Sequence, residues 1–295
     1  MPFNEDVRLG RLTTAEIYKA KALYPMALGL QGATGEMPSD RQWNIGPIRD
    51  QGQEPMCVGF TGWAWEFTQP NDSWWDTQQP DGPTLYNLAQ QNDGIPIPHW
   101  GSTVLGLLKG LNSLGLIGSY LWATTLNDVI TWLSLKGPVM VGTNWYEGMF
   151  NPDSNGFVQL TGNPIGGHAY MIYGVNNDER YVYCQNSWGT GWGQGGLFKM
   201  SFADLNRLLF QEGGEAACAL EPSSAPPPPP PAPAPEPPTP PAPPAPNSIN
   251  VTERDIATIA AALLYKFGTE RVVPISNDPS PDRENFKRLI VDYQN

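Results

Sequence analysis

The sequence predicts an α+β fold for residues 37–220, in which helices come first and antiparallel strands follow. Two stretches, "STVLGLLKGLNSLG" (102–115) and "LNDVITWLSLKG" (126–137), place apolar residues at helical spacing. From residue 138 onward the apolar runs are short, and Gly, Asn and Asp separate them, as is typical of strands. This order favours an antiparallel sheet over repeated strand–helix–strand units.

Two further helices are expected earlier in the chain. In the N-terminal extension, residues 1–36, Thr13 and Glu16 form a capping-box pattern, and Pro25 ends the helix. Another helix begins near Cys57, where the segment "VGFTGWAWEF" is apolar and aromatic. The expected strands are "PVMVGTNW", "HAYMIYGV", "RYVYCQNSW" and "GLFKMS".

The main domain is flanked by segments of other kinds. Residues 221–247 are rich in proline, and this composition predicts an extended polyproline linker. Residues 248–295 predict a small helical unit that docks on a protein partner or assembly, with Thr252 and Gly268 as helix caps. The extension at residues 1–36 is either a short propeptide or a strap packed on the domain.

Composition excludes several classes of function. The formal net charge is −12, the pI is near 4.5, and no basic run occurs, so we expect no nucleic-acid partner. The N-terminus lacks the apolar core of a signal peptide, and no stretch of about 18 apolar residues predicts a membrane span. We expect a soluble protein with no membrane insertion. An extracellular setting and a virus particle both stay open.

The chain has three cysteines and two histidines. Thiol catalysis needs a cysteine that loses its proton easily, an imidazole to hold that proton and a group to orient the imidazole. Cys57 stands at an expected helix N-terminus, which favours the thiolate, although a lone cysteine in such an apolar segment is more often a core residue. His168 begins an apolar strand after two glycines, whereas His99 follows a proline-rich turn and is interpreted as a surface or packing residue.

Asn186 is placed by the sequence to support His168. The two residues fall one hairpin apart, so their side chains can be neighbours on adjacent strands. An Asn carbonyl accepts the imidazole N–H and fixes the tautomer, and Trp188 would shield that bond from water. Cys184 is interpreted as a core thiol, while a disulfide between Cys184 and Cys218 stays open.

Three motifs resemble a known family. "PIRDQGQEPMCVGF", "GGHAYMIYGV" and "NSWGTGWGQGGLFKM" are similar to the cysteine, histidine and asparagine blocks of papain-like cysteine peptidases, in the same order. The resemblance runs from about residue 38 to residue 220 and is to bacterial-type members. The nucleophile loop departs from the family pattern: Glu54 stands where a disulfide cysteine is usual, Pro55 replaces a glycine, and Val58 replaces a tryptophan.

The resemblance implies a papain-like two-lobed fold and a role for each motif residue. Cys57 would be the nucleophile, His168 the general base and then acid, and Asn186 the group that orients the imidazole. Gln51 and the backbone N–H of Cys57 would form the oxyanion hole. Trp188 would support the site. No cofactor and no metal are implied.

The implied function is a cysteine-type endopeptidase that hydrolyses peptide bonds through a thioester at Cys57, with a protein or peptide as substrate. Gly101, Ser102 and Ala169 are the expected substrate-binding residues. One alternative is a catalytically weak or inactive module with a structural or binding role in a larger assembly such as a virus particle. Another is a thiol amidase acting on cell-wall peptides.

Overall fold

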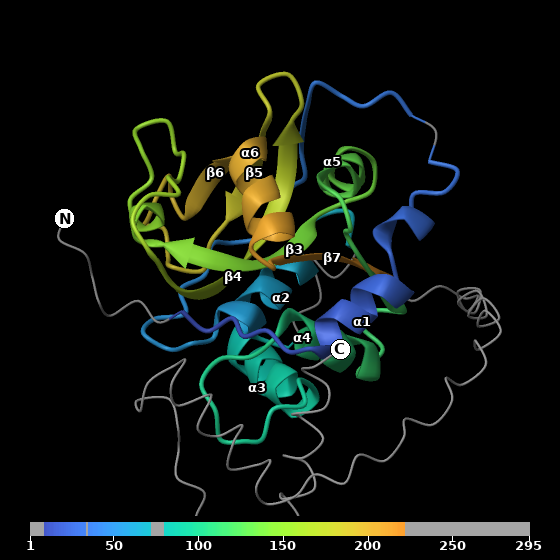
Figure 1. The fold of residues 1–295 in the computed structure, drawn as a ribbon, viewed down its shortest axis with the longest axis vertical. Coiled ribbons are helices and arrows are strands. Elements are labelled where there is room, and N and C mark those ends of the chain that lie inside the picture. Colours follow the sequence, from blue (N-terminus) through green and yellow to red (C-terminus); the bar gives the residue numbers. More distant parts are fainter. Residues whose placement is uncertain (1–8, 34, 72–79, 222–295) are drawn as a thin grey trace, which may run out of the picture. The chain divides into compact units, whose positions relative to one another are not determined.

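A computed structural model describes residues 9–33, 35–71 and 80–221 of the chain (Figure 1). Nearly all of the proline-rich linker and the whole C-terminal unit at residues 248–295 lie outside the described residues. The linker and the docking unit therefore stay predictions. Within the described ranges, no helix is both long enough and apolar enough to cross a membrane.

The described residues form helices in the first half and most of the strands in the second. The α-helices are α1 (Glu16–Leu23), α2 (Cys57–Glu66), α3 (Gly82–Asn92), α4 (Val104–Ser113), α5 (Leu126–Leu135) and α6 (Phe202–Asn206). The strands are β1 (Asp40–Gln42), β2 (Ser119–Trp122), β3 (Val139–Tyr146), β4 (Pro164–Asn176), β5 (Tyr181–Gln185), β6 (Leu197–Ser201) and β7 (Glu215–Leu220). Short 3₁₀ and π turns complete the set: η1 (Met26–Leu28), η3 (Glu147–Phe150) and η4 (Arg207–Gln211). The predicted α+β class is confirmed.

Helix ends follow the capping chemistry of the sequence in most places. The hydroxyl of Thr103 caps α4, and Thr125 with Asp128 forms a capping box at α5. The expected cap at Thr13 is wrong, because α1 begins only at Glu16 and no side chain caps it. Upstream of α1, Arg11 and Leu12 are in extended pairing with Gly167 and Ser102.

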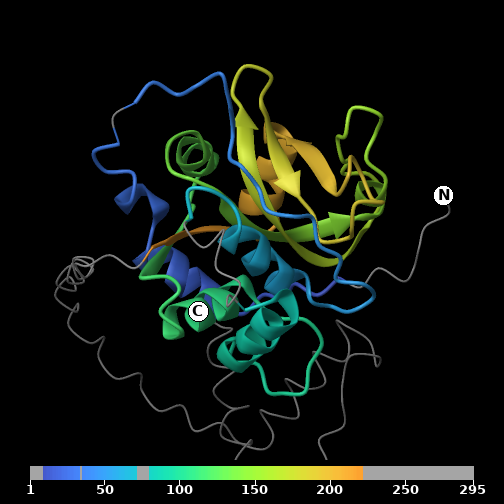
Figure 2. The ribbon, with the colours of Figure 1, turned by 180° about the vertical axis from the view of Figure 1, so that it is seen from behind.

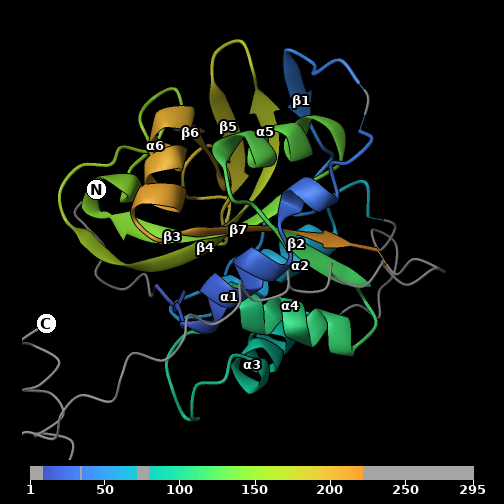
Figure 3. The same ribbon diagram turned by 45° about the vertical axis from the view of Figure 1, so that its right-hand side comes forward.

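The strands form one antiparallel sheet in the order β2-β7-β3-β4-β5-β6, with β1 paired to β4. Figures 1 and 3 show α5 and α6 on one face of the sheet and α1 to α4 on the other. The four expected strands correspond to β3, β4, β5 and β6. The sequence analysis missed the helices α3 and α6 and the strands β1, β2 and β7.

Side chains along the strands alternate between two cores, one on each face of the sheet. On β3, Val139 and Val141 pack in the core shared with α5 and α6, whereas Met140 packs in the core shared with α2 and α4. On β4, Tyr170 packs in the core shared with α5 and α6, and Ala169 packs in the core shared with α2 and α4. This alternation is the two-residue period of a strand. A sheet with both faces covered is thus the scaffold that joins the strand-borne and helix-borne residues.

The N-terminal extension, blue in Figures 1 and 2, contributes to both cores. Met26 is fully buried in the core on the α5 side, and Ile17 and Ala20 of α1 are buried in the core on the α2 side. The backbone N–H of Trp122 donates to the carbonyl of Tyr24 at 2.7 Å. The extension is therefore integrated into the domain rather than laid on its surface.

Candidate active site

Cys57 is the first residue of α2, and its side chain is fully buried. Burial raises the pKa of the thiol, because a thiolate is poorly solvated there. Backbone hydrogen bonds from Ala169, Gly10 and Val58 lower that pKa without overcoming burial. In the structure as it stands, Cys57 is a protonated thiol at neutral pH.

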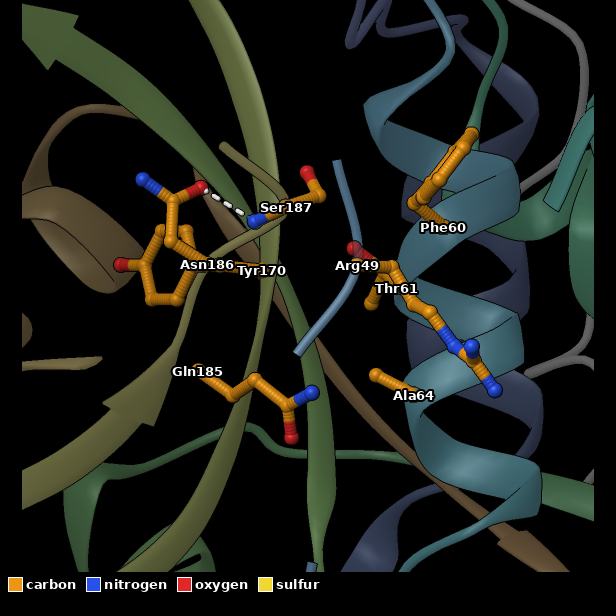
Figure 4. A pocket seen from close by; sticks show the side chains of 8 residues that line it. All are labelled: Arg49, Phe60, Thr61, Ala64, Tyr170, Gln185, Asn186 and Ser187. Atoms are coloured by element: carbon orange, nitrogen blue, oxygen red, sulfur yellow. Dashed lines mark hydrogen bonds between the residues drawn. The ribbon is translucent and has the colours of Figure 1, made fainter. Parts of the chain in front are cut away.

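His168 lies on β4 and is oriented by Asn186, which follows β5. The distance from His168 Nε2 to Asn186 Oδ1 is 2.8 Å. The same Asn186 oxygen accepts the backbone N–H of Ser187 at 2.8 Å (Figure 4), which identifies it as the carbonyl end of the amide. Nε2 of the imidazole therefore carries the hydrogen, and Nδ1 is left as an acceptor. Among the described residues, buried Nδ1 has no hydrogen-bond partner.

Aromatic rings enclose the imidazole of His168. The ring centroids of Trp145 and Trp188 lie 4.8 Å and 4.7 Å from that of His168, and His168 is fully buried. Burial lowers the pKa of His168 to about 4, and the hydrogen bond to Asn186 opposes this shift only in part. The imidazole is neutral at pH 7 and able to accept a proton at Nδ1. Trp188 lies where the sequence analysis expected a shield for the His168–Asn186 bond.

Gln51 ties the loop before α2 to the segment that holds Asn186. Its backbone N–H donates to the carbonyl of Ser187 at 2.8 Å, and its side-chain oxygen accepts the Ser187 hydroxyl at 2.6 Å. The Gln51 side-chain N–H donates to the carbonyl of Glu54 at 2.6 Å. Ser187 was missed in the sequence analysis, although it directly follows Asn186 in the quoted motif. Its hydroxyl fixes which end of the Gln51 amide presents N–H groups.

Residues 9–12 of the N-terminal extension, here called the cleft segment, run between two parts of the site. The backbone N–H of Arg11 donates to the carbonyl of Gly167 at 2.9 Å. On the other side, Ser102 donates to the Gly10 carbonyl at 2.8 Å and accepts the N–H of Leu12 at 2.8 Å. The cleft segment is thus paired with the residue before His168 and with Ser102 at the same time.

The expected substrate-binding residues all border this segment or Cys57. Ser102 pairs with it, Ala169 contacts Cys57, and Gly101 has a positive φ of 81° beside Gly10. A Cβ atom on Gly101 would overlap the Gly10 carbonyl oxygen, so only glycine permits this approach. Gly101 and Ser102 therefore contact the chain's own N-terminal extension in this structure.

A narrow pocket opens behind Asn186, between α2 and β5 (Figure 4). Its lining consists of Arg49, Phe60, Thr61, Ala64, Tyr170, Gln185, Asn186 and Ser187. Cys57 is not among these residues, and the Gly10 backbone lies against its sulfur. The space at the thiol is filled by the cleft segment.

The other two cysteines stand apart from this site. Cys184 on β5 and Cys218 on β7 are both buried and both free, so the open question of a disulfide is answered against it. Burial raises the pKa of both thiols well above the ordinary value. His99 is half-buried, with Nε2 3.0 Å from a carboxylate oxygen of Asp93.

Comparisons with known proteins agree with this arrangement. Residues 119–212 match the family model described as papain family cysteine protease, a range that includes His168 and Asn186 and leaves out Cys57. The chain is 28% identical over 117 residues to cathepsin B-like cysteine proteinase 4 of Caenorhabditis elegans and 37% identical over 70 residues to a cathepsin B-like cysteine proteinase of Schistosoma japonicum. These alignments cover 39% and 23% of this chain, and only 29% and 20% of the two relatives.

Solved structures share the fold. Xylellain, a cysteine protease from Xylella fastidiosa, superposes with a TM-score of 0.56 at 14% identity, over 75% of this chain and 98% of that one. The proCathepsin B S9 structure from Trypanosoma congolense has the same TM-score and identity, over 72% and 87% of the two chains. Residues 119–212 are thus similar to the papain family cysteine proteases, and the described residues have a papain-like fold.

Proposed function

We propose that the chain is a cysteine-type endopeptidase that uses Cys57 as nucleophile and His168 as base and acid. The observation that carries the proposal is the tautomer of His168. Asn186 holds the hydrogen on Nε2, so the free lone pair is on Nδ1, with no competing partner among the described residues. A buried neutral imidazole that presents only an acceptor is suited to take a proton from a thiol.

The reaction then follows from the residues in place. Nδ1 of His168 takes the Cys57 proton, and the sulfur attacks the peptide carbonyl carbon to form a tetrahedral oxyanion. The Gln51 side-chain N–H and the Cys57 backbone N–H would donate to that oxyanion. His168 returns the proton to the leaving amine as the C–N bond breaks and a thioester forms. Water, deprotonated by His168, hydrolyses the thioester and frees the Cys57 thiol.

The cleft segment makes this structure a resting state. It covers Cys57, and its burial of the site disfavours the thiolate–imidazolium pair that catalysis requires. A substrate can reach Cys57 only if residues 9–12 move away. Because Met26 and Ile17 lie in the cores, we infer that the extension is a strap whose α1 and η1 parts stay packed while the cleft segment leaves.

The altered nucleophile loop is compatible with this role. The carbonyl of Glu54 accepts the Gln51 side-chain N–H, so the loop positions the oxyanion donor without a disulfide. Pro55 is buried, and its carbonyl lies against Gly10. Glu54 thus positions the proposed oxyanion donor Gln51, and Pro55 packs against the cleft segment.

The test is iodoacetamide alkylation of Cys57 at mildly acidic pH, together with digestion of casein, in full-length protein. A catalytic thiol reacts at pH values at which an ordinary thiol is sluggish. We expect rapid alkylation of Cys57 and digestion of casein once the cleft segment is displaced, for example in the Gly10→Ala variant. Sluggish alkylation and no digestion in a folded, displaced variant would favour the inactive module. Cleavage of peptidoglycan fragments but not of casein would favour the amidase.

A further inference from the structure

Trp145 on β3 packs directly against the imidazole of His168. Thr143 pairs with His168 across β3 and β4, and Trp145, two residues further along β3, lies on the same face of the sheet. The centroids of the Trp145 ring and the imidazole are 4.8 Å apart, at an interplanar angle of 71°. Trp188 contacts the same imidazole at 4.7 Å, with its ring tilted by 36°. The imidazole is therefore in contact with two indole rings.

Other aromatic rings fix Trp145 in place. It is fully buried, and ring centroids surround its own at 5.2–6.3 Å: those of Phe150, Tyr170, Trp188, Trp192 and Phe198. The indole N–H of Trp145 has no hydrogen-bond partner among the described residues. Packing alone thus holds the indole, and an apolar replacement breaks no hydrogen bond within this part of the chain.

The proposed reaction creates a positive charge beside Trp145. The proton that leaves the sulfur of Cys57 goes to Nδ1 of His168, and the neutral imidazole becomes an imidazolium in a fully buried site. Burial disfavours this charge and lowers the pKa of His168 to about 4, while the hydrogen bond to Asn186 opposes the shift only in part. A buried cation needs a further group that compensates for the lost water.

No carboxylate among the described residues supplies that compensation. The pKa of His168 is set by burial and by the Asn186 hydrogen bond, with no contribution from a charged side chain. The titratable side chains on the neighbouring segments are Cys57 of α2, Tyr170 of β4, Cys184 of β5, and Arg11 of the cleft segment with its partner Glu215. Burial raises the pKa of Tyr170 and of Cys184, so both are neutral. Within the described residues, the thiolate of Cys57 is the one anion that forms next to the imidazolium.

We propose that Trp145 stabilises the imidazolium of His168 through its π system, and so acts as a positioning residue for the thiolate–imidazolium pair. An aromatic ring whose centroid lies within about 6 Å of a cation attracts it, most strongly where water is excluded, and tryptophan does so best. The proposal rests on the peptidase function proposed above. It adds a residue, not singled out in the sequence analysis, that offsets part of the cost of a buried charge.

The experiment follows the protonation of His168 directly, in the full-length chain with Gly10→Ala and Cys57→Ala. The second change removes the thiol, so the imidazole titrates without a coupled partner. The chain has two histidines, so ¹³C-labelled histidine gives two NMR signals, and His99→Gln assigns them. Leucine is apolar but has no π system. We expect Trp145→Leu to lower the titration midpoint of His168 by about half to one pH unit, as the loss of a desolvated cation–π contact implies.

Trp145→Phe and Trp122→Leu are the matched variants. Phenylalanine keeps a π face and should restore most of the midpoint. Trp122 is likewise fully buried, with an indole N–H that has no partner among the described residues, but it lies in the core shared with α2 and α4. Its replacement should leave the midpoint unchanged.

Three results overturn the proposal. An unchanged midpoint in Trp145→Leu shows that the indole does not stabilise the imidazolium. A raised midpoint shows that Trp145 acts only by excluding water, because better solvation favours the charged imidazole. An equal fall in Trp145→Phe and Trp145→Leu assigns the effect to lost packing rather than to the π system. Where Trp145→Leu does not fold, Trp145→Met takes its place, since methionine is apolar and fills irregular space.

Alkylation of Cys57 tests the consequence for the nucleophile. In the Gly10→Ala chain with its thiol intact, Trp145→Leu should slow iodoacetamide alkylation at mildly acidic pH about three- to tenfold, because fewer molecules hold the thiolate–imidazolium pair. Failure of the proposed peptidase function has a different signature: Cys57 is sluggish and casein is not digested in any variant. The titration of His168 needs neither reaction, so it still decides the role of Trp145.

Discussion

The side-chain oxygen of Asn186 lies 2.8 Å from His168 Nε2 and, at the same distance, from the backbone nitrogen of Ser187. One oxygen accepting two N–H groups leaves the amide a single orientation and the imidazole a single tautomer. The acceptor nitrogen of His168 is consequently Nδ1, and this relationship underlies the expected effects of changing the site.

Removal of Cys57 or His168 should abolish turnover, while removal of Asn186 should weaken it less. In the proposed mechanism, Cys57→Ala deletes the nucleophile, and His168→Ala deletes a general base whose contribution is typically about 10²–10⁴ in rate. Asn186→Ala leaves both groups present and only releases the imidazole orientation. The measurement is kcat with casein-derived peptides in the Gly10→Ala background, with circular dichroism to check folding. Full activity of His168→Ala would contradict the assignment.

Gly10→Ala should displace the cleft segment and expose Cys57. A Cβ atom on Gly10 would overlap the carbonyl oxygen of Pro55, which belongs to the backbone and cannot move aside cheaply. We expect faster iodoacetamide alkylation of Cys57 at mildly acidic pH than in the unchanged chain. Gly191→Ala is the matched control, because no atom lies within 4 Å of a Cβ at that position. Identical alkylation rates in the two variants would contradict the inference that the cleft segment covers Cys57.

The sequence predicted the class of fold and the pairing of His168 with Asn186, but not the segment that covers Cys57. Helix and strand periodicity located α4, α5 and the strands β3 to β6, because one face or both faces of each element are apolar. The spacing of His168 and Asn186 in two adjacent strands was visible for the same reason. The pairing of Arg11 with Glu215 was not, since it joins residues at opposite ends of the domain through tertiary contacts.

The missed elements also have physical explanations. Asp81 and Pro83 at the start of α3 are a capping signal that the sequence analysis did not use: the Asp81 carboxylate accepts the backbone N–H of Thr84. The short strand β1 is exposed on all its residues, so it shows no burial pattern. Such elements are defined by the strand or helix they pack against rather than by their own residues.

Met26→Ala should destabilise the domain even though Met26 belongs to the N-terminal extension. Its side chain is fully buried in the core on the α5 side, and removal of such a side chain typically costs about 2–5 kcal/mol in the free energy of unfolding. Urea unfolding measures the change. Leu23→Ala is the control: its side chain is 54% exposed, and we expect an effect within about 0.5 kcal/mol. Equal, small effects would indicate that the extension is a removable propeptide.

His168 should make the domain less stable in acid. Its pKa in the folded chain is about 4, below the ordinary 6.5, so the unfolded chain binds the proton first as the pH falls. Stability from this residue is fully present above pH 6.5 and is lost between about pH 6.5 and 4, with a limit of roughly 3 kcal/mol. Glu215 acts in the opposite direction, because its raised pKa makes the folded chain bind a proton more readily.

Urea unfolding at pH 7, 5 and 4 separates these two contributions. The His168→Gln variant keeps a neutral side chain of similar reach and removes only the titration of the imidazole. As the pH falls from 7 to 4, the unfolding free energy of the unchanged chain should therefore decrease more than that of the His168→Gln variant. A difference that stays constant across this range would mean that His168 titrates normally, and thus that the imidazole is not held buried and neutral beneath the cleft segment.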